Sequence, residues 1–380
     1  MEFNLQQAFG ELRSVLNESR IDRARQKTLQ RLVSQGYKRA PSIFLEQWLP
    51  YLDDFAHKLE RPLWLDVGAI EGLAQAPSLG RSRAIGWYLR FAYCGGDDLF
   101  RGDDAKLMTS FPQFEDVVGI DLSGHKIEDA GVETFFDVSN KNRLAYLKLG
   151  SNKLTSASTA LISERSRSSH LRVLDLQNNN LGDEGLLALA ESQFLYNLRY
   201  LQLADTRIKD VGLFALTESS FFSQLTHLGL GWHKLNTSHL GAILRDHPLE
   251  HLTHLDLSHT EIGVQGAEVI AESEQLDNLE CLYIGENGLR TQGAYALARS
   301  PHMANLRHLD LTANWIQSDW IDLIERDNAL DNLRTLDLSW NRIQRDSIDE
   351  LIAAGTLPSL QEVNLDRRSF TLGAPLQHGW

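Results

Sequence analysis

Histidines, a cysteine and carboxylates near the middle of the chain are the residues whose types and spacing suggest chemistry. His227, His254, Cys281 and His308 follow one another at intervals of 27 residues, and all four are transition-metal ligand types. On successive parallel strands they form a line with steps of about 4.8 Å, so the four do not close a tetrahedron around one ion. Two or three neighbouring residues of this line, together with Asp256, remain a possible ligand set for zinc. Metal-dependent binding is therefore kept as an alternative, and no metal ligand or cofactor is assigned.

Catalytic motifs are not found in this sequence. It contains no HExxH, GxSxG, GxxxxGK[ST] or paired CxxC, and no GxGxxG that opens a helix after a strand. An enzyme would have to assemble its site across distant segments, and nothing in the sequence suggests that. We therefore expect a protein that is not an enzyme.

The elements that position these residues are repeats. In LRVLDLQNNNL the apolar positions are Leu171, Leu174, Leu176 and Leu181, and the first position recurs every 27 residues from Val117 to Leu360. The LxL piece alternates as a strand with one buried face does, and the second half of each unit favours a helix. A column of large apolar residues recurs in these helices, at Phe135, Ile162, Leu189, Leu216, Ile243, Ile270, Leu297, Ile324 and Leu351. No unit of this size buries its apolar face alone, so neighbours must stack.

The pattern LxxLxLxxNxL with a helical second half resembles leucine-rich repeat proteins of the ribonuclease-inhibitor-like type. The stretch ARSPHMANLRHLDLTANWI resembles the bacterial intracellular members, so we expect a bacterial source. Strands spaced about 4.8 Å apart and helices about 10 Å wide must bend such a stack. The resemblance implies an α/β fold, a right-handed leucine-rich repeat solenoid or horseshoe with a parallel β-sheet on the concave face and helices on the convex face.

The resemblance implies that the Asn residues of this pattern form a buried ladder. Their side chains would satisfy backbone hydrogen-bonding groups where the chain leaves the sheet. Its position is filled by His125, Asn152, Asn179, Thr206, His233, Thr260, Asn287, Asn314, Asn341 and Arg368. We expect a regular ladder in repeats 2 and 3 and in repeats 7 to 9, counted from the repeat that begins at Val117. Thr can bond in the same place with less reach, whereas His and Arg are larger departures. Asn197, Asn278, Asn305 and Asn332, just before the first leucine, favour a left-handed turn.

The ends of the chain lack the regular period. Residues 1–60 predict a helical N-terminal cap, 61–116 two degenerate repeats with an acidic loop, 117–362 the regular 27-residue repeats, and 363–380 a C-terminal cap. An open solenoid end exposes core, which explains why caps are expected. The N-terminal cap is rich in Lys and Arg, so a second docking surface there is an alternative to a solvated helix face.

The concave sheet is the surface on which binding is expected, and its outward positions follow from the register. Aromatic and histidine side chains gather there beside carboxylates, as they do in interface hot spots. We predict partner binding at Tyr146, Tyr200, His227, Trp232, His254, Asp256, His259, Tyr283, Glu286, His308, Asp310 and Trp340. Gly229 and Gly231 are expected to leave a depression between His227 and Trp232.

Composition limits the partner. The formal net charge of −14 disfavours nucleic acid and anionic membranes and favours a protein with a basic or neutral surface. Two cysteines and the absence of a signal or membrane-spanning segment favour a cytoplasmic protein, which we expect to be monomeric. The main prediction is a protein–protein interaction scaffold. The alternative is a regulator of a small GTPase, for which Arg90 and Arg101 are the first residues to test.

Overall fold

Two compact units make up the chain, Met1–Leu174 and Asp175–Trp380. The computed structural model describes residues 5–17, a few positions between 25 and 48, and 64–67, 87–91, 117–137, 144–165, 170–365 and 368–371. Strand β5 (Val173–Asp175) crosses the division between the two units.

Unit 1 combines a helix near its start with parallel strands. Helix α1 (Leu5–Asn17) comes first, and α7 (Glu128–Asp137) and α8 (Ser156–Arg165) each follow a strand. The strands pair in parallel in chain order, as β1 (Trp64–Val67), β2 (Trp87–Phe91), β3 (Val117–Asp121) and β4 (Tyr146–Lys148). The predicted domain boundaries after residues 60, 116 and 362 stay predictions.

Unit 2 repeats a strand and a helix along its length. Its parallel strands are β6 (Tyr200–Gln202), β7 (His227–Gly229), β8 (His254–Asp256), β9 (Cys281–Tyr283), β10 (His308–Asp310), β11 (Thr335–Asp337) and β12 (Glu362–Leu365). Its helices are α9 (Gly182–Ala190), α10 (Asp210–Thr217), α11 (Thr237–Asp246), α12 (Gly263–Ala271), α13 (Arg290–Ala298), α14 (Asp319–Arg326) and α15 (Arg345–Ala354). Short 3₁₀ turns precede three strands, at η5 (Phe222–Gln224), η6 (Glu274–Leu276) and η7 (Pro301–Met303).

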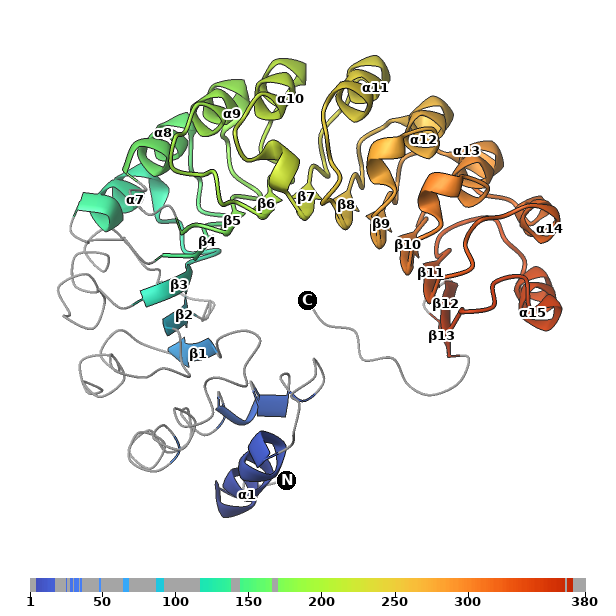
Figure 1. Cartoon of the computed structure of the whole chain (residues 1–380), viewed down its shortest axis with the longest axis horizontal. Coiled ribbons are helices and arrows are strands. Elements are labelled where there is room, and N and C mark those ends of the chain that lie inside the picture. The colour runs from blue at the N-terminus through green and yellow to red at the C-terminus, as the bar shows by residue number, and fades with distance from the viewer. Residues whose placement is uncertain are drawn as a thin grey trace. The chain divides into compact units, whose positions relative to one another are not determined.

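The strands of unit 2 line its inner side and the helices its outer side, as Figure 1 shows. Each strand pairs with the next at the same repeat position, as in Tyr200 with His227 and His254 with Cys281. At the far end, β13 (Arg368–Thr371) pairs with β12 in antiparallel orientation. The predicted α/β repeat fold is confirmed.

The core lies between the strand leucines and one face of the helices. All nine residues of the predicted apolar helix column are buried, and so are the central strand residues such as Leu201, Leu255 and Leu309. Full burial of one such side chain contributes about 1.5–3 kcal/mol. Each column runs through neighbouring repeats. This stabilisation therefore depends on the stacking of repeats within each of the two compact units.

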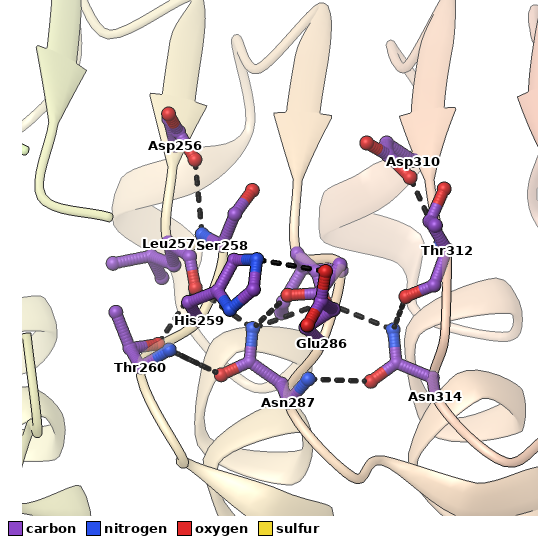
Figure 2. A network of polar contacts seen from close by, with 12 residues as sticks. Asp256, Leu257, Ser258, His259, Thr260, Glu286, Asn287, Asp310, Thr312 and Asn314 are labelled. Carbon is purple, nitrogen blue, oxygen red and sulfur yellow. Dashed lines mark hydrogen bonds and ion pairs between the residues drawn. The ribbon is translucent and has the colours of Figure 1, made fainter. Parts of the chain in front are cut away.

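In unit 2 a ladder of side chains closes the turns after strands β6 to β11, as the sequence predicts; Figure 2 shows its members Thr260, Asn287 and Asn314. Asn287 Oδ1 accepts from the backbone N–H of Thr260 at 3.0 Å, while its Nδ2 donates to Leu257 O at 2.7 Å. Asn314 repeats this pattern one unit later, accepting from Asn287 N at 3.0 Å and donating to Ile284 O at 2.9 Å. One amide therefore satisfies a donor and an acceptor that the turn would otherwise leave buried and unpaired.

The backbone beside the ladder is left-handed. The residue before each ladder position has positive φ at Ser151, Asn178, Asp205, Trp232, His259, Glu286, Ala313 and Trp340, as has Gly124. Non-glycine residues adopt this conformation at a cost of about 1–2 kcal/mol each. Their N–H groups continue the pairing between repeats, as in Trp232 N to Ser258 O at 2.8 Å and His259 N to Gly285 O at 2.9 Å. These bonds and the ladder hold the turn in place.

The prediction of left-handed turns at the asparagines before the first leucine is wrong. None of these residues has positive φ. Instead, Asn278 Nδ2 donates to Glu250 O at 2.9 Å, Asn305 Nδ2 to Asp277 O at 2.7 Å and Asn332 Nδ2 to Ala304 O at 3.0 Å. These amides form a second, exposed row of hydrogen bonds between repeats, because a side-chain amide can satisfy a neighbouring carbonyl without changing its own backbone.

Substituting Asn314→Ala should destabilise unit 2 by about 3 kcal/mol, because it leaves the N–H groups of Asn287 and Leu289 buried without their acceptor. The urea midpoint followed by circular dichroism measures the effect. Asn180→Ala is the matched control, since the exposed Asn180 side chain makes no hydrogen bond with a described residue. Equal midpoints for the two variants would contradict the structural importance of the ladder.

Candidate functional site

Aromatic rings and imidazoles stack along the face of the sheet in unit 2. The rings of Tyr200 and His227 lie 5.3 Å apart between centroids, and those of His227 and His254 lie face to face at 3.9 Å. Further along, Tyr283 and His308 lie 4.7 Å apart. The structure thus brings together five of the predicted binding residues on β6 to β10, with their rings half-buried against one another.

Threonines fix the orientation of two of these imidazoles. Thr226 Oγ1 donates to Arg199 O at 3.0 Å and contacts His227 Nδ1 at 2.9 Å. Because the hydroxyl proton is already used, the proton in the second contact belongs to Nδ1 of the imidazole. Thr253 and His254 repeat the same pair of contacts. Both rings therefore carry a proton on Nδ1, and they stack with an angle of 16° between their planes.

The carboxylates between the strand leucines also serve the scaffold. Asp256 Oδ1 accepts from Ser258 N at 2.9 Å and Asp310 Oδ1 from Thr312 N at 2.8 Å, as Figure 2 shows. Burial, together with the charges of Asp337 and Asp256, raises the pKa of Asp310. Burial and the charges of Asp175 and Asp256 raise the pKa of Tyr200 to about 12. Besides burial, the neighbouring carboxylates therefore act on both groups as negative charges.

A second set of site residues lies at the ends of the strands. Asp205, Trp232, His259 and Glu286 occupy the same position in four successive repeats, and we call them the strand-end row. Trp232 and His259 stack face to face with their ring centroids 3.6 Å apart. His259 Nε2 lies 2.8 Å from Glu286 Oε1 (Figure 2). Trp232 nevertheless keeps 59% of its surface exposed, so the row presents an indole that is accessible and held in place.

The expected depression at Gly229 is filled by a side chain. A Cβ added at Gly229 would lie only 2.0 Å from Gln202 Oε1, so the Gln202 side chain lies over this glycine. At Gly231 a Cβ would meet Ser258 O at 3.0 Å, because the two turns approach closely there. The glycines therefore admit a neighbouring side chain and a neighbouring backbone, which a linear sequence pattern does not reveal.

Trp315 is an exposed aromatic that the register did not select. It keeps 55% of its surface exposed, close to the 60% of Trp340. It follows the ladder residue Asn314 and has a positive φ of 61°, and its ring extends toward Gly288. The sequence did carry a signal for this residue, because Trp315 stands where the preceding repeat has Gly288.

Other predicted features are placed differently or lie outside the described residues. Tyr146 is half-buried in β4 of unit 1. Arg90 belongs to β2, of which only the backbone is described, while Arg101 and the acidic loop at 94–104 lie outside the described residues. The GTPase alternative therefore stays a prediction.

The described residues provide neither a metal-binding cluster nor a membrane-spanning helix. No group of three or more His, Cys, Asp or Glu side chains among them is arranged to hold a metal ion. None of the described helices has the length and apolar character of a membrane span.

Comparison with known proteins identifies the repeats. A family model described as Leucine Rich repeat matches residues 167–190, 197–216, 249–271 and 330–350. The repeats are leucine-rich repeats. The ribonuclease-inhibitor-like type and the bacterial source stay predictions. A search of curated proteins found no significant match.

Solved structures similar to this chain include a yeast complex and a bacterial internalin. The crystal structure of the Rad7 and Elc1 complex in yeast matches with a TM-score of 0.56 and 16% identity, over 90% of this chain and 89% of that chain. An internalin, inlF, from Listeria monocytogenes str. 4b F2365 matches with a TM-score of 0.39 and 18% identity, over 70% of this chain and 88% of that chain. At this identity the likeness to the yeast structure shows the fold alone.

One leucine-rich repeat at the site carries a histidine in the ladder. His233 is 4% exposed, and its Nδ1 lies 2.9 Å from Leu230 O while its Nε2 accepts from Thr206 N at 3.1 Å. This arrangement needs a neutral ring with its proton on Nδ1. Burial lowers the pKa of His233 below its usual value. The predicted inward-facing substitute is confirmed, directly after Trp232.

Replacing His233→Asn should make unit 2 less sensitive to acid. The unfolded state gains a proton at this histidine as the pH falls below about 6.5, while the folded state resists it, so stability is full above that pH and falls below it. Between about pH 7.5 and about pH 5, the urea midpoint of the wild type should drop more than that of the variant. Equal drops would show that protonation of His233 does not oppose folding.

Proposed function

We propose that this leucine-rich repeat chain is a scaffold that binds a partner protein through the strand face and strand-end row of unit 2, and that the partner presents a basic surface. The observation that carries the proposal is an accessible, preorganised indole at Trp232, set among carboxylates. Aromatic anchors with little conformational freedom are typical of interface hot spots. One solved structure of similar fold is a complex of two proteins, Rad7 and Elc1, which is compatible with such a role.

The charge of this surface supports a basic partner. The outward positions of the strands and strand ends in unit 2 include no lysine or arginine within residues 175–365. They carry carboxylates at Asp205, Asp256, Glu286, Asp310, Asp337 and Glu362. A surface of one sign steers a partner of the opposite sign and disfavours partners of like charge. Exposed apolar area beside that charge provides the contact that holds the complex.

The rigidity of the surface is a second argument for binding. Imidazoles are fixed by Thr226 and Thr253, and the indole of Trp232 is fixed by His259. Side chains that are already ordered lose less conformational entropy when a partner binds. A surface held in this way therefore fits recognition better than it fits a purely solvated face.

Substituting Tyr200, Trp232 and Tyr283 together by alanine should abolish capture of the partner from a native lysate, because it removes the aromatic anchors. The matched control substitutes Val211 and Phe214 by serine, since these two exposed apolar residues lie on helix α10. Affinity capture with quantitative mass spectrometry compares the proteins retained by each variant. Unchanged capture by the triple variant, or loss by the control alone, would contradict the proposed surface.

Salt should weaken the complex. Raising the ionic strength from about 0.05 M to about 0.5 M screens the carboxylates and should lower the affinity about 10-fold or more, mainly through a slower association rate. Surface plasmon resonance with the captured partner measures both rates. An affinity that does not change with salt would mean that the acidic face does not contact the partner.

A further inference from the structure

The strand-end row places an acid, an indole and an imidazole in fixed order. The N–H of Asp205 bonds Gly231 O at 3.1 Å, and the N–H of Trp232 bonds Ser258 O at 2.8 Å. Asp205 and Trp232 have φ values of 52° and 63°, so both side chains leave the same kind of turn in the same sense. Asp205, Trp232 and His259 therefore stand side by side in three successive repeats.

One face of the Trp232 ring is covered and the other is not. His259 from the following repeat stacks on it with an angle of 18° between the planes, and Glu286 holds His259 from the repeat after that. A planar ring covered from the following repeat turns its second face toward the preceding repeat, which is that of Asp205. With 59% of Trp232 exposed, this second face is open to solvent.

Asp205 supplies the charge beside that open face. Its side chain is exposed, and no described residue forms a hydrogen bond or an ion pair with its carboxylate. A carboxylate beside an indole face is suited to a planar cation, which can stack on the ring and donate hydrogen bonds to the acid at the same time.

We propose that Trp232 and Asp205 form a docking site for the guanidinium of an arginine side chain from the partner protein. This inference rests on the proposed function, because it names the anchor that a basic partner would use. The guanidinium is planar and weakly hydrated and has donors in a fork that fits a carboxylate. The ammonium of lysine is a compact, strongly hydrated charge that stacks less well, so arginine is the occupant that the geometry favours.

The chain contains its own matched control for this site. Trp340 occupies the same position as Trp232 in a later repeat and is equally exposed, at 60%. Its neighbour in the preceding repeat is Ala313, which has no carboxylate. An arginine should therefore bind measurably at Trp232 and not at Trp340.

The test is a titration of the full chain with the short peptide acetyl-Gly-Arg-Gly-amide, followed by NMR of the tryptophan indole N–H signals. The Trp232 signal is assigned from Trp232→Phe. We expect a saturable shift of this signal that Asp205→Asn weakens about 10-fold, with little change at Trp340. The lysine peptide should bind more weakly, and the uncharged citrulline peptide should give no shift.

The inference is overturned if the arginine peptide leaves the Trp232 signal unmoved, if Asp205→Asn binds as well as the wild type, or if lysine or citrulline binds equally well. Failure of this inference can be distinguished from failure of the proposed function. If Asp205→Asn and Trp232→Phe capture the partner normally while the triple aromatic variant does not, the surface is right and this anchor is wrong. Loss of capture only in the α10 control would reject the surface itself.

Discussion

The ladder that follows strands β6 to β11 is the interaction on which the rest of unit 2 depends. At this point the chain must leave the sheet and turn toward a helix, and its backbone groups are far from water. Asn287, Asn314 and Asn341 supply a donor and an acceptor there, since Asn341 Oδ1 also accepts from Asn314 N at 2.9 Å. An unpaired polar group at this depth would cost about 1–3 kcal/mol in every repeat, so the ladder decides whether repeats can stack at all.

The same turn determines how side chains are displayed. Because backbone N–H groups make the bonds between neighbouring turns, the backbone pairing at the position before each ladder residue does not depend on which side chain stands there. Asp205, Trp232, His259, Glu286 and Ala313 follow one another at this position without disturbing the backbone. The backbone therefore fixes the direction and spacing of the row, while the type of side chain differs from one repeat to the next.

Much of this could be predicted from the sequence because the 27-residue period fixes register, and register fixes which residues face the core, the ladder or the sheet surface. The buried column through Ile270 and Leu297 and the inward position of His233 follow from counting alone. The ring stacks of His227 on His254 and of Trp232 on His259 do not, because they depend on side-chain rotamers. The left-handed backbone at Trp232 and His259 could not be predicted either, since only a few per cent of non-glycine residues adopt positive φ.

Two predictions failed for the same physical reason. The space over Gly229 is taken by Gln202 from the preceding repeat, and the asparagines before the first leucine bond a carbonyl of the preceding repeat. In both cases the decisive partner comes from another unit, and a residue's own local pattern does not show it. The carboxylates of Asp256 and Asp310 have two roles that the sequence did not reveal together. They accept hydrogen bonds from backbone amides in the turns, and they give the surface its charge.

Hydroxyl-radical footprinting of the chain, alone and with its captured partner, tests the central claim most directly. It reads the solvent exposure of individual aromatic side chains, and unit 2 has exposed ones at its strand ends, such as Trp232, and on helix α10, at Phe214. Our account predicts that Trp232 and Trp340 lose reactivity in the complex while Phe214 and Tyr196 keep theirs. Protection of Phe214 and Tyr196 with Trp232 and Trp340 unchanged would contradict it.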